Sequence, residues 1–135
     1  SYTGNNRTHM IRIPDPGRFE LRLMDGSANP YLLQASVLAA GLDGLKNKID
    51  PGKPLNCNMY EDHKKYPNLP KLPDELDQSL EKLKNNKDMN DAFGKDTINS
   101  YIKLRTSEIN EFKQKETFDK TKTITRWERN NTLDC

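Results

Sequence analysis

Residues 7–23 read RTHMIRIPDPGRFELRL, and this stretch decides the fold expected for the chain. From Arg18 to Leu23 charged and apolar residues alternate, which is the two-residue period of a strand with two different faces. Asp15-Pro16-Gly17 supplies turn chemistry before that strand. The run Met10–Ile13 is rich in β-formers but alternates less cleanly, which favours a bulge there. The stretch therefore predicts a β-hairpin over residues 7–23.

A helix is expected directly after the hairpin. Asn29 is a good helix N-cap, and Pro30 at the first helical position gives up no needed hydrogen bond. Up to Gly41 the segment is apolar on nearly all sides, and apolar residues continue to Ile49. This pattern predicts a helix over residues 30–49 that is buried within something larger.

The chain changes character near residue 73. All eight prolines lie at or before Pro73, and 25 of the last 62 residues are charged. Residues 50–73 are therefore expected to form a long Pro-rich loop, a kind of segment that is often functional. Residues 74–135 are expected to form a solvated helical layer and a tail. Within it the sequence predicts one helix starting just after Pro73 and a long one from about Thr97 to Phe118.

Composition limits the function classes. The chain has 135 residues, about one domain, with 33% hydrophobic residues and a mean hydropathy of −1.00. No stretch approaches the roughly 20 apolar residues of a membrane span. The net charge is only +2, and aromatic residues are not interleaved with the arginines, which speaks against nucleic-acid binding. Two cysteines do not make a disulfide framework, so a reducing compartment is expected.

The charged face of the hairpin carries the chemistry. Arg18, Glu20 and Arg22 stand at alternate positions, with Arg7 and Arg12 nearby. Guanidinium groups offer planar donor forks suited to phosphate and carboxylate oxygens. A carboxylate among them is a natural ligand for Mg²⁺ bound to a nucleotide. The alternative is an exposed strand edge held by cross-strand ion pairs, and the pattern alone leaves both open.

In order and spacing, these residues resemble the C-terminal active-site region of glutamine synthetase. The resemblance is strong from Asn6 to about Leu83 and weaker to the end, and it looks most like the type III branch, which also holds the γ-glutamylmethylamide synthetases. It implies an α+β fold, the C-terminal fragment of a glutamine synthetase-type catalytic domain. The matching motifs are Asn6-Arg7-Thr8, Ile11-Arg12-Ile13-Pro14, Arg18-Phe19-Glu20-Leu21-Arg22, Asp25, Asn29-Pro30-Tyr31, 39–49, Asn58-Met59-Tyr60 and Leu69-Pro70.

The resemblance implies that ATP phosphorylates the γ-carboxylate of L-glutamate and that ammonia then displaces phosphate. It assigns Arg7 to the transferring phosphoryl group, as a catalytic and ATP-binding residue. Arg12 and Arg18 are assigned to the nucleotide phosphates. Glu20 is assigned to one of two divalent ions, Mg²⁺ or Mn²⁺, and Arg22 to a carboxylate of glutamate.

Two positions depart from the better-known type I enzymes of this family. The turn Asp15-Pro16-Gly17 is shorter than theirs and lacks their nucleotide-contacting lysine. Tyr60 falls where some of them carry an adenylylated tyrosine, but the sequence after it differs. We therefore expect Tyr60 to be a plain surface tyrosine.

The family's N-terminal domain and its other metal ligands would lie before Ser1. We therefore expect the segment alone to be inactive. The resemblance also implies a cytoplasmic, ring-forming homo-oligomer. Two alternatives stay open: methylamine as the amine acceptor, and a non-catalytic module that binds nucleotide.

Overall fold

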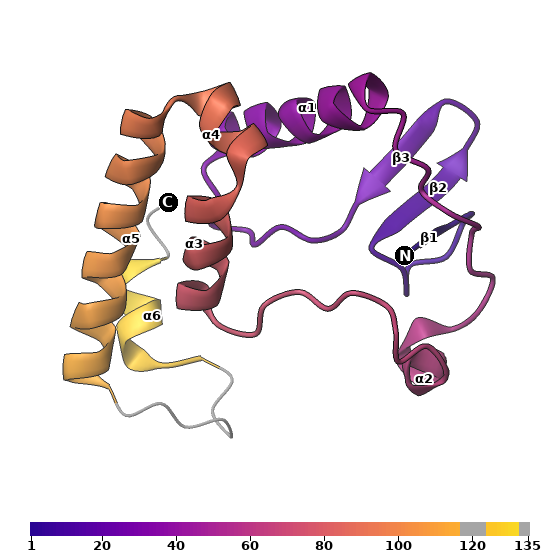
Figure 1. Ribbon diagram of the computed structural model, residues 1–135. Helices are drawn as coiled ribbons and strands as arrows, with labels where there is room; N and C mark the ends of the chain where they lie inside the picture. Colours follow the sequence, from indigo (N-terminus) through magenta and orange to yellow (C-terminus); the bar gives the residue numbers. More distant parts are fainter. Residues whose placement is uncertain (117–123, 133–135) are drawn as a thin grey trace. The chain divides into compact units, whose positions relative to one another are not determined.

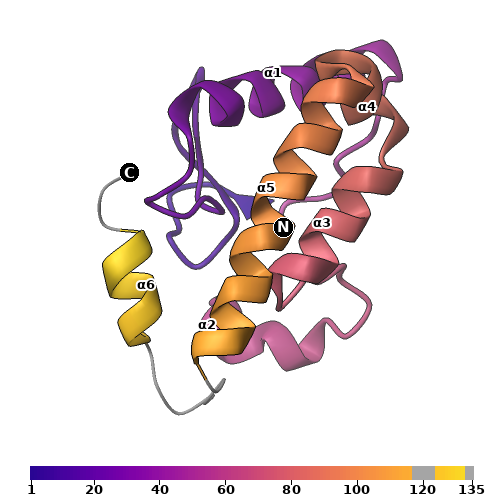
Figure 2. The same cartoon turned by 90° about the vertical axis from the view of Figure 1, so that its left-hand side faces the viewer.

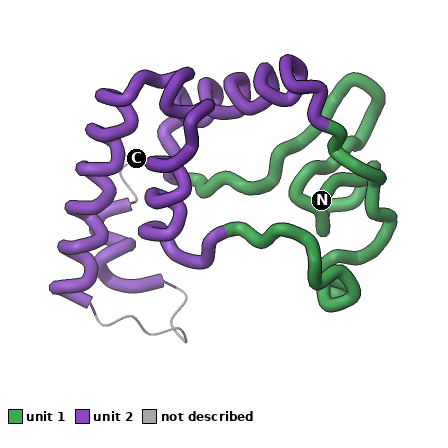
Figure 3. The backbone as a smooth tube through the Cα atoms, in the orientation of Figure 1, with its two compact units in different colours: residues 1–26, 50–72 green, residues 27–49, 73–135 purple. Residues whose placement is uncertain are grey.

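The computed structural model describes residues 1–116 and 124–132, which fall into two compact units (Figure 3). Unit 1 comprises residues 1–26 and 50–72, and unit 2 comprises residues 27–49 and 73–135. Unit 1 contains the sheet and unit 2 most of the helices, so the fold is α+β as expected. In the part of the chain that the structure describes, no helix is both long and apolar enough to span a bilayer.

Unit 1 is built on a three-stranded sheet (Figure 1). Strand β1 (Tyr2–Thr3) pairs in parallel with β2 (Ile11–Asp15), which pairs antiparallel with β3 (Arg18–Leu21). The β2–β3 turn contains Gly17 at a φ of +78°, a conformation that glycine adopts without steric cost. The predicted hairpin is therefore present, with strands shorter than the 7–23 range.

The hairpin contains a bulge on β2. Arg12 pairs with Glu20 and Asp15 pairs with Arg18, so β2 uses one more residue than β3 over the same interval. Pro14 lies in that interval and has no N–H to donate to a ladder. The irregularity falls between Arg12 and Asp15, slightly later than the expected Met10–Ile13 run.

Residues 50–72 are not a uniform loop, which corrects the expectation of a structureless 50–73 segment. They contain a short helix α2 (Met59–Asp62) followed by the 3₁₀ turn η1 (His63–Lys65). The side chain of Asn58 caps α2 by accepting a hydrogen bond from the backbone N–H of Tyr60. Such a cap organises one turn locally even in a proline-rich context.

In unit 2, helix α1 runs from Pro30 to Lys46, three residues short of the predicted end at Ile49. The Asn29 side chain accepts from the N–H groups of Tyr31 and Leu32, at 3.0 and 3.1 Å, so the predicted N-cap is confirmed. Not one α1 residue is buried, and Leu38 and Leu45 are 64% and 78% exposed. Burial of this helix against something larger therefore stays a prediction.

The helical layer consists of α3 (Leu76–Asn85), α4 (Lys87–Phe93), α5 (Lys95–Lys115) and α6 (Arg126–Asn131). Helices α3 and α5 lie side by side in both views (Figure 1, Figure 2). Leu80 on α3 and Ile98 on α5 are the buried apolar residues among those described. The ring of Trp127 on α6 meets Phe112 edge-on at 5.7 Å. The predicted long helix begins earlier, at Lys95, and its predicted end at Phe118 lies outside the described residues.

Candidate functional site

The centre of the charged hairpin face is a pair between Arg12 and Glu20. The β2–β3 register sets the two residues opposite each other. Nη1 of Arg12 donates to both carboxylate oxygens of Glu20, at 2.7 Å each. The Arg12 side chain is only 11% exposed and that of Glu20 33%, so the pair is shielded from water on one side. Charge-assisted bonds of this kind fix geometry better than neutral ones.

Arg18 adds a second positive charge to the same carboxylate. Its Nη2 lies 3.6 Å from Oε1 of Glu20 and 3.5 Å from Oδ2 of Asp15. The contact shows that Arg18 and Glu20 point the same way, as the alternation predicted. The Arg18 side chain is 59% exposed, so these longer pairs contribute little to stability. Its guanidinium remains accessible to a ligand.

Glu20 stays ionised in this environment. The hydrogen bond from Arg12 lowers the pKa of Glu20 below its ordinary value, and the charges of Arg12, Arg18 and Arg22 lower it further. The carboxylate is thus a ready oxygen ligand for a hard cation. Among the described residues, no group of three or more His, Cys, Asp or Glu side chains is arranged to hold a metal ion. Glu20 alone therefore does not make a metal site within the part of the chain that the structure describes.

Arg7 and Arg22 flank this centre. Arg7 is exposed and helps to line a cavity of about 420 Å³ in unit 1. The other residues that line it are Thr3, Gly4, Asn5, Asn6 and Asn56. Arg22 follows β3, where its backbone N–H donates to the carbonyl oxygen of Met10 at 2.8 Å and extends the hairpin. Its side chain is exposed.

Arg7 stands in a turn that polar side chains tie to the distant segment 57–59. Asn6 Oδ1 accepts from the Thr8 N–H at 2.9 Å, and Asn6 Nδ2 donates to the carbonyl of Cys57 at 2.9 Å. Thr8 Oγ1 accepts from the N–H of Met59 at 3.0 Å. These bonds bracket Arg7 on both sides. Side-chain-to-backbone bonding by Asn and Thr is ordinary turn chemistry, but the sequence does not reveal the distant partners.

His9 also takes part in this attachment. It is 2% exposed, and its Nε2 lies 3.0 Å from the carbonyl oxygen of Cys57, while Nδ1 lies 3.1 Å from Oγ of Ser1. His9 therefore has a packing role in this part of unit 1. Tyr60, by contrast, is 72% exposed on α2, in agreement with a surface tyrosine.

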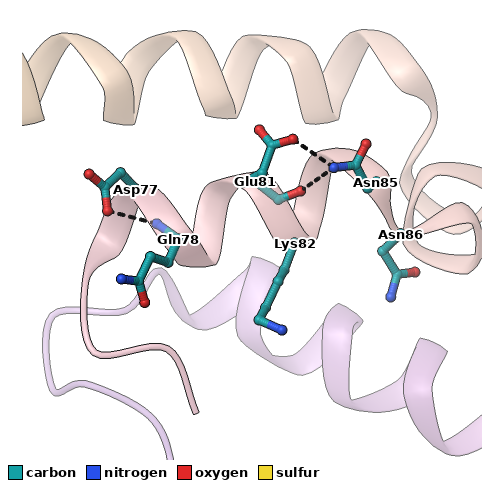
Figure 4. Close-up of a pocket in the computed structure, with 6 residues that line it drawn as sticks. All are labelled: Asp77, Gln78, Glu81, Lys82, Asn85 and Asn86. Carbon is teal, nitrogen blue, oxygen red and sulfur yellow. Dashed lines mark hydrogen bonds between the residues drawn. The ribbon is translucent and has the colours of Figure 1, made fainter. Parts of the chain in front are cut away.

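A larger depression of about 880 Å³ lies along α3 in unit 2 (Figure 4). Its polar side chains do not point to a common centre: most bond within or beside α3, and Asp77 also accepts from Nζ of Lys113 on α5 at 3.3 Å. Asp77 accepts from the N–H of Gln78 at 2.8 Å, and Asn85 donates to the backbone and side chain of Glu81. None of the site residues that the sequence predicted lines it. The hairpin is therefore the better candidate site.

Comparison with known proteins identifies the family of the chain. The family described as "Glutamine synthetase, catalytic domain" matches residues 1–130. The chain belongs to the glutamine synthetase family. A glutamine synthetase of Rhizobium meliloti (strain 1021) is 44% identical over 134 residues, covering 99% of this chain and 29% of that protein. A glutamate–methylamine ligase of Methyloversatilis universalis is 37% identical over 98% of this chain and 28% of that protein.

Solved structures show the same likeness in three dimensions. A structure titled "GmaS/ADP complex-Conformation 1" matches with a TM-score of 0.78 and 40% identity over 99% of this chain. A ligand-free structure of GmaS matches with a TM-score of 0.76 and 41% identity over 98% of the chain. In both cases the chain spans 29% of the length of the matched protein. The match supports the α+β fragment of a glutamine synthetase-type catalytic domain.

Proposed function

We propose that this chain is the C-terminal part of an ATP-dependent glutamate–ammonia ligase that makes glutamine through a γ-glutamyl phosphate intermediate. One observation carries the proposal: the hairpin of a glutamine synthetase family member gathers three of its arginines around an ionised Glu20. Phosphoryl transfer needs little covalent chemistry from the protein, because it depends on positioning and on the stabilisation of developing charge. Guanidinium groups supply both.

Each arginine takes a part in this reaction. Arg12 and Arg18 hold phosphate oxygens of ATP, and Arg7 neutralises the phosphoryl group as it moves to the γ-carboxylate of glutamate. Arg22, the residue after the end of β3, holds a carboxylate of glutamate through its two-donor fork. The exposure of Arg7, Arg18 and Arg22 supports these parts, because exposed guanidinium groups are free to meet a ligand.

Glu20 would hold one divalent ion, Mg²⁺ or Mn²⁺, which supplies charge neutralisation to the phosphates when bound. Both Glu20 oxygens accept from Arg12, but a carboxylate oxygen has a second lone pair for a cation. The remaining ligands belong to other parts of the longer protein. For that reason we propose that residues 1–135 alone are inactive, and that the active form is a cytoplasmic homo-oligomer.

The test is an amine-dependent assay on the full-length protein that contains this chain. With glutamate, ATP and Mg²⁺ present, release of phosphate should require ammonia and should vanish when glutamate is left out. ATP binding without amine-dependent release of phosphate would contradict the ligase and favour a non-catalytic nucleotide-binding module.

Methylamine is the second candidate acceptor. It is favoured by the 37% identity to a glutamate–methylamine ligase. The 44% identity to a glutamine synthetase favours ammonia. The ratio of kcat/KM for the two amines, measured in the same assay, decides between them.

A further inference from the structure

Asn5 accepts hydrogen bonds from the edge of the Arg12 guanidinium that does not contact Glu20. Nε of Arg12 donates to Oδ1 of Asn5 at 2.9 Å, and Nη2 donates to the same oxygen. Nη1 meanwhile donates to Glu20. Two different side chains, Asn5 and Glu20, therefore hold the guanidinium by hydrogen bonds on two sides. None of the sequence patterns singled out Asn5.

The backbone explains why Asn5 reaches Arg12. Thr3 pairs with Arg12 in the parallel ladder of β1 and β2, and the N–H of Ile13 donates to the carbonyl of Gly4 at 3.2 Å. The chain leaves β1 just after this bond, so Asn5 follows beside the Arg12 side chain. A residue two positions from the end of a paired strand is thus held by the sheet itself.

Arg12 has more N–H donors than its bonds to Asn5 and Glu20 use. A guanidinium has five N–H donors in a fixed plane. Nη1 is used on Glu20, and the single Nε–H and one N–H of Nη2 are used on Asn5. In the part of the chain that the structure describes, this leaves one N–H of Nη2 without an assigned acceptor, besides the N–H of Nη1 that points away from Glu20. Its direction is fixed because the plane is fixed.

We propose that Asn5 is a positioning residue, which locks the Arg12 guanidinium so that its remaining Nη2 N–H meets a phosphate oxygen of the nucleotide. This inference rests on the proposed function, in which Arg12 binds ATP. Asn5 does not touch the nucleotide in this arrangement and acts only through Arg12.

The amide is suited to this part because it is neutral. A carboxylate at residue 5 would accept the same two hydrogen bonds, but it would place a second negative charge beside Arg12 in addition to Glu20. That charge would repel phosphate oxygens at short range. Asn5 therefore orients Arg12 without cancelling its attraction for an anion.

The experiment uses four variants of the full-length protein: Asn5→Ala, Asn5→Asp, Arg12→Lys and the double variant Asn5→Ala/Arg12→Lys. Asn99→Ala is the matched control, because Asn99 is an exposed asparagine on α5, remote in sequence from the hairpin. The measurements are the dissociation constant of ATP, KM for ATP and for glutamate, and the melting temperature. ATP binding gives a readout that does not require turnover.

Asn5→Ala should weaken ATP binding about tenfold, the scale of one charge-assisted hydrogen bond, and leave KM for glutamate within about twofold. In the Arg12→Lys background it should add less than about twofold, because lysine has no Nε donor and no fork to orient. Asn5→Asp should keep the melting temperature and still weaken ATP binding. Asn99→Ala should change none of these values.

Several results would overturn the inference. Equal weakening of ATP binding by Asn5→Ala with Arg12 and with Lys at residue 12 would mean that Asn5 acts independently of Arg12. Equal rises in both KM values together with a lower melting temperature would make its role structural. If ATP binds but no amine is ligated, the proposed function fails while the binding cycle still tests Asn5. If ATP does not bind at all, both fail.

Discussion

Unit 1 and unit 2 differ in the interactions that stabilise each of them. In unit 1, side chains such as Asn6, Thr8 and His9 bond to backbone groups about fifty residues away, and charged pairs fix the hairpin face. In unit 2, α3 and α5 lie side by side, and Leu80 on α3 and Ile98 on α5 are buried. Hydrogen bonds are directional and apolar contacts are not. The comparison teaches that, among the described residues, the unit with the candidate site buries polar side chains, Thr3 and His9, whereas the buried apolar side chains lie in unit 2.

The largest expected effect concerns the state of association of unit 2. The isolated 135-residue chain should associate through the exposed apolar residues of α1, because soluble monomers rarely leave such a surface uncovered. Sedimentation should show oligomers or aggregates, and a double exchange of Leu38 and Leu45 for Gln should shift them toward monomer. The control is Leu104→Gln, at a residue 56% exposed on α5. A monodisperse unmodified monomer would contradict the expectation.

A second prediction tests the apolar core of unit 2. Leu80 is 6% exposed, so Leu80→Ala should lower the free energy of unfolding by about 2–5 kcal/mol. Leu104→Ala, on an exposed face, should change it by only about 0.5 kcal/mol. Urea unfolding followed by circular dichroism measures both. Equal losses at the two residues would mean that unit 2 has no specific core.

In unit 1 the corresponding test is electrostatic. Glu20→Gln keeps the shape of the side chain but removes the charge that a divalent cation needs. In the full-length protein, metal affinity and kcat should fall together by about a hundredfold, while KM for glutamate changes much less. Metal titration and steady-state kinetics measure this. Asp15→Asn removes a more exposed carboxylate from the same hairpin and is the control; an equal effect there would contradict a specific role for Glu20.

Arg18, at the start of β3, and Arg22, just after its end, should differ in what they bind. Lysine keeps the charge of arginine but loses the two-donor fork. Arg22→Lys should therefore raise KM for glutamate by about ten- to a hundredfold with little change for ATP, and Arg18→Lys should do the reverse. Steady-state kinetics with each substrate varied in turn would show it. If both variants shift both substrates alike, the division of parts between the two arginines is wrong.

The smallest expected effect is the pH response of Glu20. Its pKa in the folded chain is lowered from the ordinary value of 4.5, chiefly by the hydrogen bond from Arg12. Ionised Glu20 therefore stabilises the folded chain fully above pH 4.5. This stabilisation is lost as the pH falls below 4.5, through the lower pKa that Glu20 has in the folded chain. Carboxyl NMR titration should find the Glu20 midpoint below 4.5, and Arg12→Gln should move it upward. A midpoint that Arg12→Gln leaves unchanged would contradict the pairing as the cause.

Local patterns accounted for most of the fold. Alternation and the Asp15-Pro16-Gly17 turn predicted the hairpin, and Asn29-Pro30 predicted the start of α1, because these signals act between near neighbours. Helix α2 was missed because a single capping asparagine, Asn58, is a weak signal inside a proline-rich segment. The sequence also did not separate α4 from its neighbours, although Gly94, at a φ of +80°, ends it.

The charged residues of the hairpin face could be read from the sequence, but which of them pair could not. The pattern left cross-strand ion pairs open without naming the partners, and the resemblance assigned Arg12 and Glu20 to different ligands. Their pairing depends on a register that the bulge shifts by one residue, and such a shift cannot be read from alternation alone. The attachments of Asn6 and Thr8 to residues 57–59 depend on long-range packing and left no local signal.

The bulge between Arg12 and Asp15 also bears on how this hairpin tolerates changes in length. It separates the Arg12–Glu20 pair from the turn at Pro16 and Gly17, so the ladder on the Arg12 side does not depend on the pairing beside the turn. Residues added to the turn would alter the Asp15–Arg18 pairing first and leave Arg12 opposite Glu20. The bulge thus allows residues to be inserted at the tip of the hairpin, while Arg12 stays opposite Glu20.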